Sequence, residues 1–326
     1  MSAPSPAQDY GADRELICID FKSELERLVS EGARLDLIYP ADDPHTAVLA
    51  RDGETIRLTS RPDASRPAAG LPPFERSFVL SRAGSDRGEG RAGMLYRDLI
   101  PDRLGGRYIA SHITIASGGP VEDWVHFHRI ALQLIYVRAG WVRVVYEGQG
   151  PAFVMKPGDL VLQPPGIRHR VLESSPGLEV VEISAPALHA TFADHELSLP
   201  TVELQNGRLF DGQMFLRHVA ADTPWTEWRG VEAQETGLRE ASAGLVSART
   251  IRAGGARSLS FPPNEGELVF GFVLDGRAQL GVAAVAEADA FAIPPGDSWT
   301  LEGLSHDFRL FHVTTARLDD AATSPL

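Results

Sequence analysis

The chain has 326 residues, 43% of them hydrophobic, and a formal net charge of -13 at pH 7, which suffices for a substantial core in about two domains. The acidic balance argues against nonspecific binding to nucleic acid or to an anionic membrane, because both depend on clustered Lys and Arg. The single Cys18 excludes an intramolecular disulfide, and no apolar stretch has the length of a membrane span or a signal-peptide core. We therefore expect a soluble, cytoplasmic protein.

Residues 1–75 predict a small α+β module. After a polar, proline-bearing start, Leu25, Leu28 and Val29 recur at helical spacing. Residues 46–60 then alternate in polarity around Asp52-Gly53, which is a hairpin signal. Residues 61–73 are rich in Pro, Ala and Ser and look like a linker.

The rest of the chain favours an all-β core. The 31 Gly and 23 Pro are scattered rather than clustered, which is typical of short strands joined by tight turns. The most informative segment is HFHRIALQ at 126–133, followed by GDLVLQPPGIRH at 158–169. Successive side chains of a strand point to opposite faces, so His126 and His128 project together while Phe127 turns away. This pattern indicates a metal site inside a β-barrel.

An internal repeat follows. Gly119 and Gly255 lie 136 positions apart, as do Gly140 and Gly276, whereas the PPG at 164–166 and the PPG at 294–296 lie 130 apart. A six-residue deletion between strands explains the change of offset. Repetition of this kind is what a duplicated barrel would leave.

These residues carry a family resemblance. The run Gly119, His126, His128, Gln133, Gly140 resembles the first cupin motif, with one extra residue before His126 and a glutamine where a glutamate is usual. The run Gly158, Pro164, Gly166, His169 resembles the second motif. Over about 76–320 the chain is thus similar to a bicupin, which implies two tandem double-stranded β-helix (jelly-roll) barrels after the α+β module. The expected domains are 1–75 (module and linker), 76–200 (metal-binding barrel) and 201–326 (degenerate, metal-free barrel).

The resemblance implies that His126, His128, Gln133 and His169 bind one divalent transition metal. Fe(II) is favoured, and Zn, Ni or Mn also suit such ligands. Gln133 either completes the coordination or only hydrogen-bonds a ligand or substrate. Because glutamine is neutral, the ion keeps its full charge at the site, which favours a small anionic substrate.

The second copy carries no such ligands. The same offsets map the four residues onto Pro262, Asn264, Val269 and Trp299, which are not a plausible ligand set. We expect Trp299 to fill the space, leaving this barrel a role in packing, dimerisation or shaping the first pocket. The alternative is an independent ligand pocket lined by Trp299 and Phe291.

The predicted function is that of a metal-dependent bicupin enzyme, first an Fe(II) dioxygenase acting on a carboxylate or aromatic anion, with gentisate-type bicupins as the precedent that the resemblance supplies. The alternatives are a non-oxidative isomerase, decarboxylase or lyase, and a metal-containing binding or sensor protein without catalysis. Cupin barrels commonly pair, so a homodimer is expected. Candidate substrate contacts near the motifs are Arg107, Tyr108, Trp124 and Arg143, with Arg168 and Arg170 as further cations.

Overall fold

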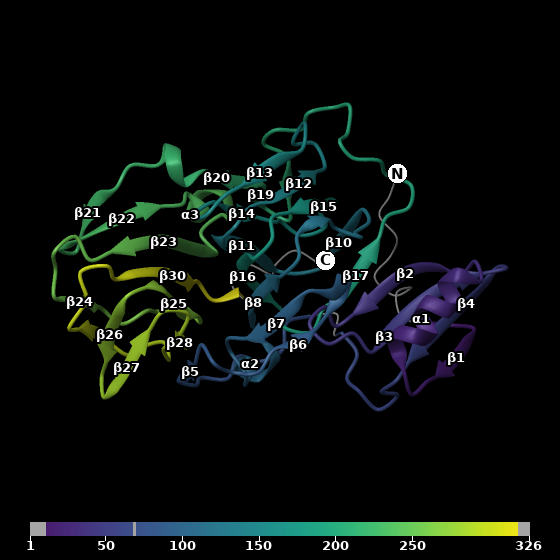
Figure 1. Cartoon of the computed structure of the whole chain (residues 1–326), viewed down its shortest axis with the longest axis horizontal. Coiled ribbons are helices and arrows are strands. Elements are labelled where there is room, and N and C mark those ends of the chain that lie inside the picture. Colours follow the sequence, from purple (N-terminus) through teal and green to yellow (C-terminus); the bar gives the residue numbers. More distant parts are fainter. Residues whose placement is uncertain (1–10, 68–69, 319–326) are drawn as a thin grey trace.

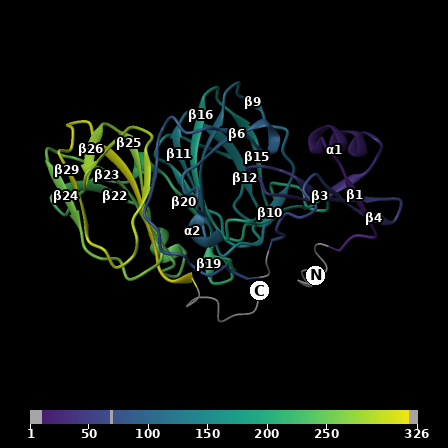
Figure 2. The same cartoon turned by 90° about the horizontal axis from the view of Figure 1, so that it is seen from below.

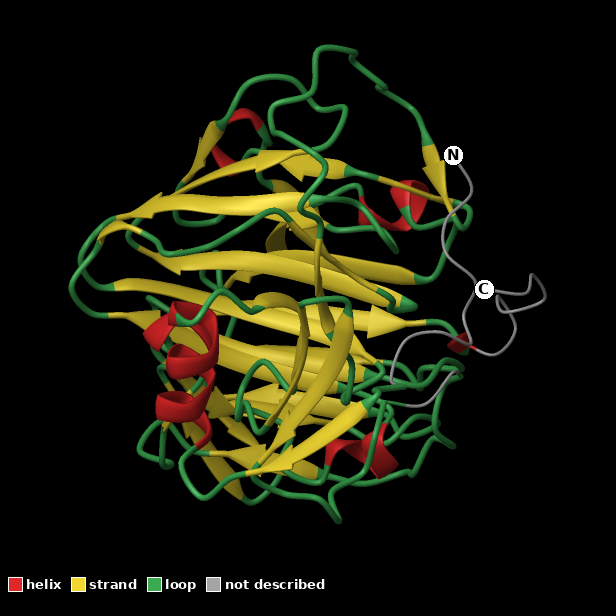
Figure 3. Ribbon diagram, turned by 90° about the vertical axis from the view of Figure 1, so that its right-hand side faces the viewer, coloured by secondary structure: helices red, strands yellow, loops and turns green. Residues whose placement is uncertain are grey.

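Three bodies lie in a row along the molecule: a small N-terminal module, a first barrel and a second barrel (Figure 1). The computed structural model describes residues 11–67 and 70–318. A quarter turn shows the same order, with helix α1 (Phe21–Ser30) at the end opposite the second barrel (Figure 2). Strands dominate the regular structure (Figure 3), which confirms the predicted all-β class.

The N-terminal module is one helix on a four-stranded sheet. Asp20 caps α1 by accepting a hydrogen bond from the Ser23 backbone N–H at 3.0 Å, which satisfies a donor that the first helical turn leaves free. Phe21 and Leu28 face a core that includes Leu58. The four strands of the module are β1 (Arg14–Ile17), β2 (Arg34–Tyr39), β3 (Thr46–Arg51) and β4 (Glu54–Thr59). None of the helices found in the described ranges combines the length and the hydrophobicity that crossing a bilayer requires.

The predicted hairpin at Asp52-Gly53 is confirmed. Arg51 pairs with Glu54, and the two turn residues have φ values of 51° and 84°. Positive φ at both central positions is what the tight two-residue hairpin turn requires, and Asp-Gly supplies it with little strain. The sheet of the module also extends the first barrel, because β2, which lies beside β3, pairs with β17 (Thr191–Ala193).

The first barrel consists of two sheets. The sheet shared with the module continues through β10 (His126–His128), β15 (His169–Ser174), β12 (Val142–Tyr146) and β13 (Phe153–Met155), with β9 (Gly119–Pro120) beside β15. The opposite sheet runs in the order β20 (Leu216–His218), β14 (Leu160–Leu162), β11 (Leu132–Ala139), β16 (Leu178–Ala185), β8 (Ile109–Ile115), β7 (Leu95–Asp98) and β6 (Gly88–Glu89). Short segments connect them: the 3-10 turn Arg91–Gly93, α2 (Arg103–Gly106) and the hairpin of β18 (Leu209–Phe210) and β19 (Gln213–Met214).

The second barrel repeats this plan. One sheet has the order β21 (Thr226–Trp228), β22 (Val231–Glu235), β23 (Val246–Arg252), β30 (Arg309–Thr315), β25 (Val269–Asp275), β28 (Ala290–Ala292) and β5 (Val79–Ser81). The other has the order β24 (Ser258–Phe261), β29 (Trp299–Glu302), β26 (Arg277–Leu280) and β27 (Ala283–Ala286). The 3-10 turn Ala220–Asp222 and helix α3 (Leu238–Ala241) precede the barrel's central strands.

Backbone hydrogen bonds confirm the repeat inferred from the offsets. Two bonds of the first barrel have counterparts in the second, each at 2.9 Å: Gly166 N to His128 O matches Gly296 N to Asn264 O, and Gln163 N to Gln133 O matches Ile293 N to Val269 O. Equivalent positions in the two barrels can therefore be compared side chain by side chain.

The two seven-stranded sheets pack face to face and share one hydrophobic core. Tyr136 stacks on Phe311 across this interface with ring centroids 4.2 Å apart. Arg107 and Glu267 form a buried two-pronged ion pair at 2.7 and 3.0 Å, and the Tyr108 hydroxyl donates to the same carboxylate. Removing one partner of such a pair typically costs about 3–5 kcal/mol.

Pairing also crosses the expected domain boundaries. Strand β5 precedes the first barrel in the sequence but joins the sheet of the second, and β20 follows the first barrel yet pairs with β14. The boundaries near residues 75 and 200 stay a prediction.

Candidate metal centre in the first barrel

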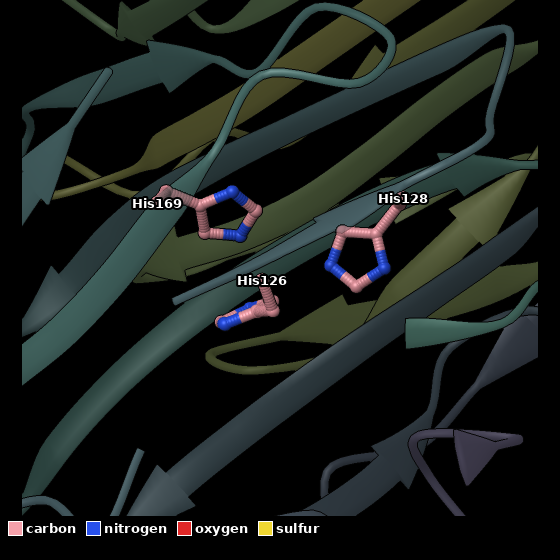
Figure 4. Close-up of side chains that lie close together, drawn as sticks. All are labelled: His126, His128 and His169. Atoms are coloured by element: carbon pink, nitrogen blue, oxygen red, sulfur yellow. The ribbon is translucent and has the colours of Figure 1, made fainter. Parts of the chain in front are cut away.

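Three histidines converge inside the first barrel. His126 lies directly opposite His169 on the antiparallel pair β10 and β15. His128 is two residues along β10, so its side chain leaves the same face. The three rings surround one common space (Figure 4), and one donor nitrogen from each lies within 4.8 Å of the others. Phe127 turns away and stacks on Phe192 at 5.2 Å.

Each imidazole has the same tautomer. In every case the Nδ1 atom faces a backbone carbonyl: Trp124 O at 2.8 Å from His126, Ile167 O at 3.0 Å from His169, and Ala190 O at 3.3 Å from His128. A carbonyl only accepts, so Nδ1 must carry the proton and Nε2 must carry the lone pair. Second-sphere bonds of this kind fix metal-binding histidines in proteins.

Burial keeps the three rings neutral. Desolvation lowers the pKa of His126 and of His128 well below the ordinary value, and nearby imidazoles and the Arg91 guanidinium add to the effect. Burial likewise lowers the pKa of His169 to about 4. Neutral imidazole is the form that binds a metal.

A buried ion pair supports His126. The Asp123 side chain is fully buried and accepts hydrogen bonds from the Arg91 guanidinium at 2.7 Å and from the Val171 backbone N–H at 2.8 Å. A second nitrogen of Arg91 lies 3.3 Å from His126 Nε2. The charge of Asp123 raises the pKa of Arg91 against the opposing effect of burial. Arg91 therefore places a fixed cation beside the histidines.

Gln133 belongs to a hydrogen-bonded chain. The Tyr146 hydroxyl donates to the amide oxygen of Gln163. The amide nitrogen of Gln163, Nε2, in turn donates to Gln133 Oε1 at 3.0 Å. Gln133 Nε2 in turn donates to Glu182 Oε1 at 3.0 Å. Because an ionised carboxylate only accepts, Glu182 fixes which end of the Gln133 amide faces it. Both roles predicted for Gln133, ligand or hydrogen-bonding support, remain predictions.

These groups line a cavity of about 100 Å³. Its walls are mainly apolar, with Met94, Ile113, Ile135, Val144, Val161 and Val180 among the lining residues. The polar lining consists of the three histidines, Arg91, Gln133, Gln163, Arg170, Glu182 and His189. The His189 ring lies 5.3 Å from that of His128, and its Nδ1 donates to Pro186 O at 2.9 Å. The arrangement suits a small, negatively charged molecule.

Three of the four predicted substrate contacts lie away from the cavity. Arg107 and Tyr108 point into the interface between the barrels and are fully engaged with Glu267. Arg143 is exposed on the outer face of β12 and pairs with Glu173 at 3.0 Å. These three do not line the cavity. Alternation along a strand decides which side a residue faces, and proximity in sequence to the motif does not override it.

Trp124, the fourth predicted contact, lies behind the cavity wall. Its ring packs edge-on against His126 at 5.4 Å, and the Arg91 guanidinium lies 5.5 Å from the ring centroid. Its role is to hold His126 through packing and through its carbonyl. Of the further cations, Arg170 lines the cavity, whereas Arg168 pairs with Asp194 at 2.9 Å.

Sequence reasoning missed four cavity residues: Arg91, Gln163, Glu182 and His189. One signal was available for Glu182, since alternation along 178–185 puts it on the same face as the apolar Leu178 and Val180. Arg91 comes from a short 3-10 turn with no periodic pattern, so its position could not be read from the sequence.

Comparisons with known proteins agree with this architecture. A family model described as "Cupin domain" matches residues 111–183. Protein Ylba from E. coli is similar in structure, with a TM-score of 0.55 and 13% identity over 76% of this chain and 95% of that one. A deletion mutant of oxalate decarboxylase OxdC from Bacillus subtilis gives 0.53 and 11%, over 77% of this chain and 80% of that one. Another structure of that decarboxylase, described as having Mn(II) centers, gives 0.52 and 11% over the same shares.

Among curated proteins, no significant sequence match is found. At 11–13% identity the solved structures show a shared fold and nothing finer. The family model matches part of the first barrel, and the solved structures share the tandem-barrel cupin fold with this chain.

Proposed function

We propose that the chain is a metal-dependent cupin enzyme that acts on a small anionic substrate in the first barrel. His126, His128 and His169 hold one divalent transition metal. The observation that supports this most is the shared tautomer of three buried, neutral imidazoles whose Nδ1 atoms are all tied to backbone carbonyls. The Nε2 atom of each ring is left as an acceptor, and a bound ion would replace the contacts that Arg91 makes with His126 Nε2 at 3.3 Å and Gln163 Nε2 makes with His169 Nε2 at 3.4 Å.

The bound ion would act as a Lewis acid on substrate oxygens and, if it is redox-active, would allow O₂ chemistry. We propose Fe(II) first, in line with an oxygenase. Mn(II) is the second candidate, because a structurally similar decarboxylase is described as having Mn(II) centers. Imidazole suits either ion, so the ligands alone do not choose between them.

The cavity selects the substrate by size and charge. Arg91 is held by Asp123 and offers its remaining N–H groups to a carboxylate or enolate oxygen. A cavity of about 100 Å³ admits a single small molecule, and the apolar walls exclude bulk water and strengthen its contact with the cation.

The reaction is proposed as a dioxygenation, with a non-oxidative isomerisation, decarboxylation or lyase reaction as the alternative. Glu182 favours the alternative, because a carboxylate that lines the same cavity can accept or return a proton at a substrate carbon. Gln133 orients this carboxylate through the 3.0 Å hydrogen bond.

Anaerobic purification with elemental analysis, followed by turnover assays on small carboxylates, catechols and hydroxybenzoates, tests the proposal. His128→Ala is the variant, and His306→Ala, at an exposed histidine of the second barrel, is the control. Oxygen uptake coupled to turnover supports the dioxygenase, and turnover without oxygen supports the alternative. A ligand released unchanged in stoichiometric amount would indicate a binding protein. A parent protein without transition metal that behaves like His128→Ala would refute the metal centre itself.

A further inference from the structure

The second barrel also has a cavity, of about 130 Å³, at the position equivalent to the metal centre. The four residues that match His126, His128, Gln133 and His169 all line it: Pro262, Asn264, Val269 and Trp299. The predicted ligand pocket in this barrel had Phe291 in its wall, but Phe291 is fully buried and lies behind Trp299. Trp299 does not fill the space, because it stacks flat on Phe261 with centroids 3.7 Å apart and leaves the cavity beside it.

His312 is the unusual residue of this cavity. Its side chain is 3% exposed, and neither ring nitrogen has a hydrogen-bond partner among the described residues. Burial, reinforced by Arg249 and Arg229, lowers its pKa to about 3, so the ring is neutral and offers one donor and one acceptor. Buried polar groups are nearly always hydrogen-bonded. A side chain that lines a cavity with both nitrogens unpartnered points to a polar ligand.

Register shows that His312 takes the place of Glu182. Glu182 lies opposite Ile135 in the first barrel, and His312 lies opposite Gly271 in the second. Gly271 is the counterpart of Ile135, because the two are 136 positions apart in the repeat. The first cavity thus has a carboxylate where the second has an imidazole. A second unpartnered donor is present too, since Asn264 Nδ2 is buried without a hydrogen-bond partner in the described chain. The Asn264 amide and the N–H of His312 can both donate to an acceptor group on the ligand.

Two arginines make this cavity electropositive. Arg249 lies 4.4 Å and Arg229 5.2 Å from the centroid of Trp228, which is itself part of the wall. Arg249 pairs with Glu235, whereas Arg229 has no ion pair within the residues described. No carboxylate is among the described lining residues. The charge of Arg229 is therefore available to an anion at the mouth of this cavity.

We infer that the second barrel binds a planar, single-ring aromatic carboxylate at a site separate from the first cavity. The ring lies against the Trp299–Phe261 wall, the carboxylate meets Arg229 and Arg249, and Asn264 and His312 complete the polar contacts. Apolar protein cavities of about 150 Å³ accept one benzene ring, so the cavity of about 130 Å³ is close to the size of the ring alone, and the carboxylate lies outside it beside the exposed Arg229. This site requires no metal, and it is independent of the function proposed for the first barrel.

The probe is 4-fluorobenzoate, followed by fluorine NMR and by tryptophan fluorescence, with the full-length protein. Arg229→Met is the decisive variant, because Arg229 is exposed and its loss leaves the core intact. Trp299→Leu is the second variant, and Arg91→Met in the first cavity is the matched control.

We expect saturable binding that Arg229→Met weakens about ten-fold, the usual effect of losing one charge-assisted contact. Trp299→Leu should weaken it too, and Arg91→Met should leave this component of the binding unchanged, whatever it does to binding in the first cavity. Absence of saturable binding to the parent protein would overturn the inference. So would binding that Arg91→Met abolishes while Arg229→Met leaves it intact. If Trp299→Leu does not fold, Arg229→Met decides alone.

Discussion

Where the first barrel has His169, the second has Trp299, and where the first has Glu182, the second has His312. The backbone bonds around these positions are the same in both barrels. One scaffold therefore presents three neutral imidazoles in one copy and an aromatic wall with an unpartnered imidazole in the other. The difference teaches that the cupin backbone supplies a cavity, while a few inward side chains decide what the cavity can hold.

The two cavities also differ in one part of their wall, which we call the floor. It is formed by β11 and β14 in the first barrel and by β25 and β28 in the second. Ile135 lies opposite Val161 in the first barrel, and both line the cavity. Their counterparts are Gly271 and Phe291, and the ring of Phe291 occupies the space that a side chain on residue 271 would need. The second cavity is thus displaced away from the floor that the first one uses.

The largest expected effect is a loss of bound metal after a substitution in the first barrel but not after one in the second. His169→Ala should lower the bound metal from one ion per chain to none and should reduce turnover by about 10³-fold or more, because the ion supplies several kcal/mol of stabilisation to the reaction. Elemental analysis and steady-state rates measure this. His312→Leu, in the other barrel, is the control and should keep its metal. Equal metal loss in both variants would contradict the asymmetry.

The next effect concerns the cation of the first cavity. Arg91→Met should raise KM by about 10- to 100-fold with a smaller change in kcat, since it removes a charge-assisted contact to the substrate. Arg91→Lys keeps the charge and should recover part of the loss. Arg143→Met, at an exposed arginine, should behave like the parent. A KM that Arg91→Met leaves unchanged would show that the substrate does not use this cation.

A third change tests the filled floor of the second barrel. Gly271→Ala places a methyl group into the ring of Phe291 and should lower the free energy of unfolding by about 1–3 kcal/mol. Gly88→Ala, where an added Cβ meets nothing within 4 Å, is the control. Thermal or urea unfolding measures the difference, and metal content should not change. A stability equal to that of Gly88→Ala would mean that the floor has room for the added methyl group.

The smallest expected effect is a pH dependence from His312. Its pKa is about 3 in the folded state, against an ordinary value of 6.5 for an exposed histidine. As the pH falls below 6.5, the unfolded chain takes up a proton that the folded chain refuses, so stability is lost on acidification. At about pH 5.5 the loss relative to about pH 7.5 is about 1.4 kcal/mol.

Urea unfolding of the parent and of His312→Leu at the two pH values isolates this contribution, and His306→Ala should retain the full dependence. Other histidines titrate in the same range, so the difference between variants is the quantity that counts. Identical losses in the parent and in His312→Leu would be the contrary result.

Much of the fold could be predicted from the sequence. Alternation at 126–128, the Asp52-Gly53 turn and the glycine offsets are local signals, and each is found in the structure as expected. The shared face of His126 and His128 follows from the same alternation, whereas His169 was predicted from the resemblance to the cupin motif. Arg91 and Gln163 could not be found in this way, because their positions depend on pairings between strands far apart in the chain. Arg107 was misplaced because it lies at the end of α2, before β8, and the sequence does not show that this segment meets the second barrel. The homodimer and the cytoplasmic location stay predictions.

The exchange of β5 and β20 has a consequence for any attempt to study one barrel alone. Cutting the chain near residue 200 separates β5 from β28 and β20 from β14, which leaves an unpaired sheet edge on each fragment. The same cut removes Glu267, the ion-pair partner of Arg107, and leaves the Arg107 charge unpaired at the former interface between the barrels. Each barrel completes its sheet with a strand from the other part of the sequence. We therefore expect the chain to be produced, and to evolve, as a single piece.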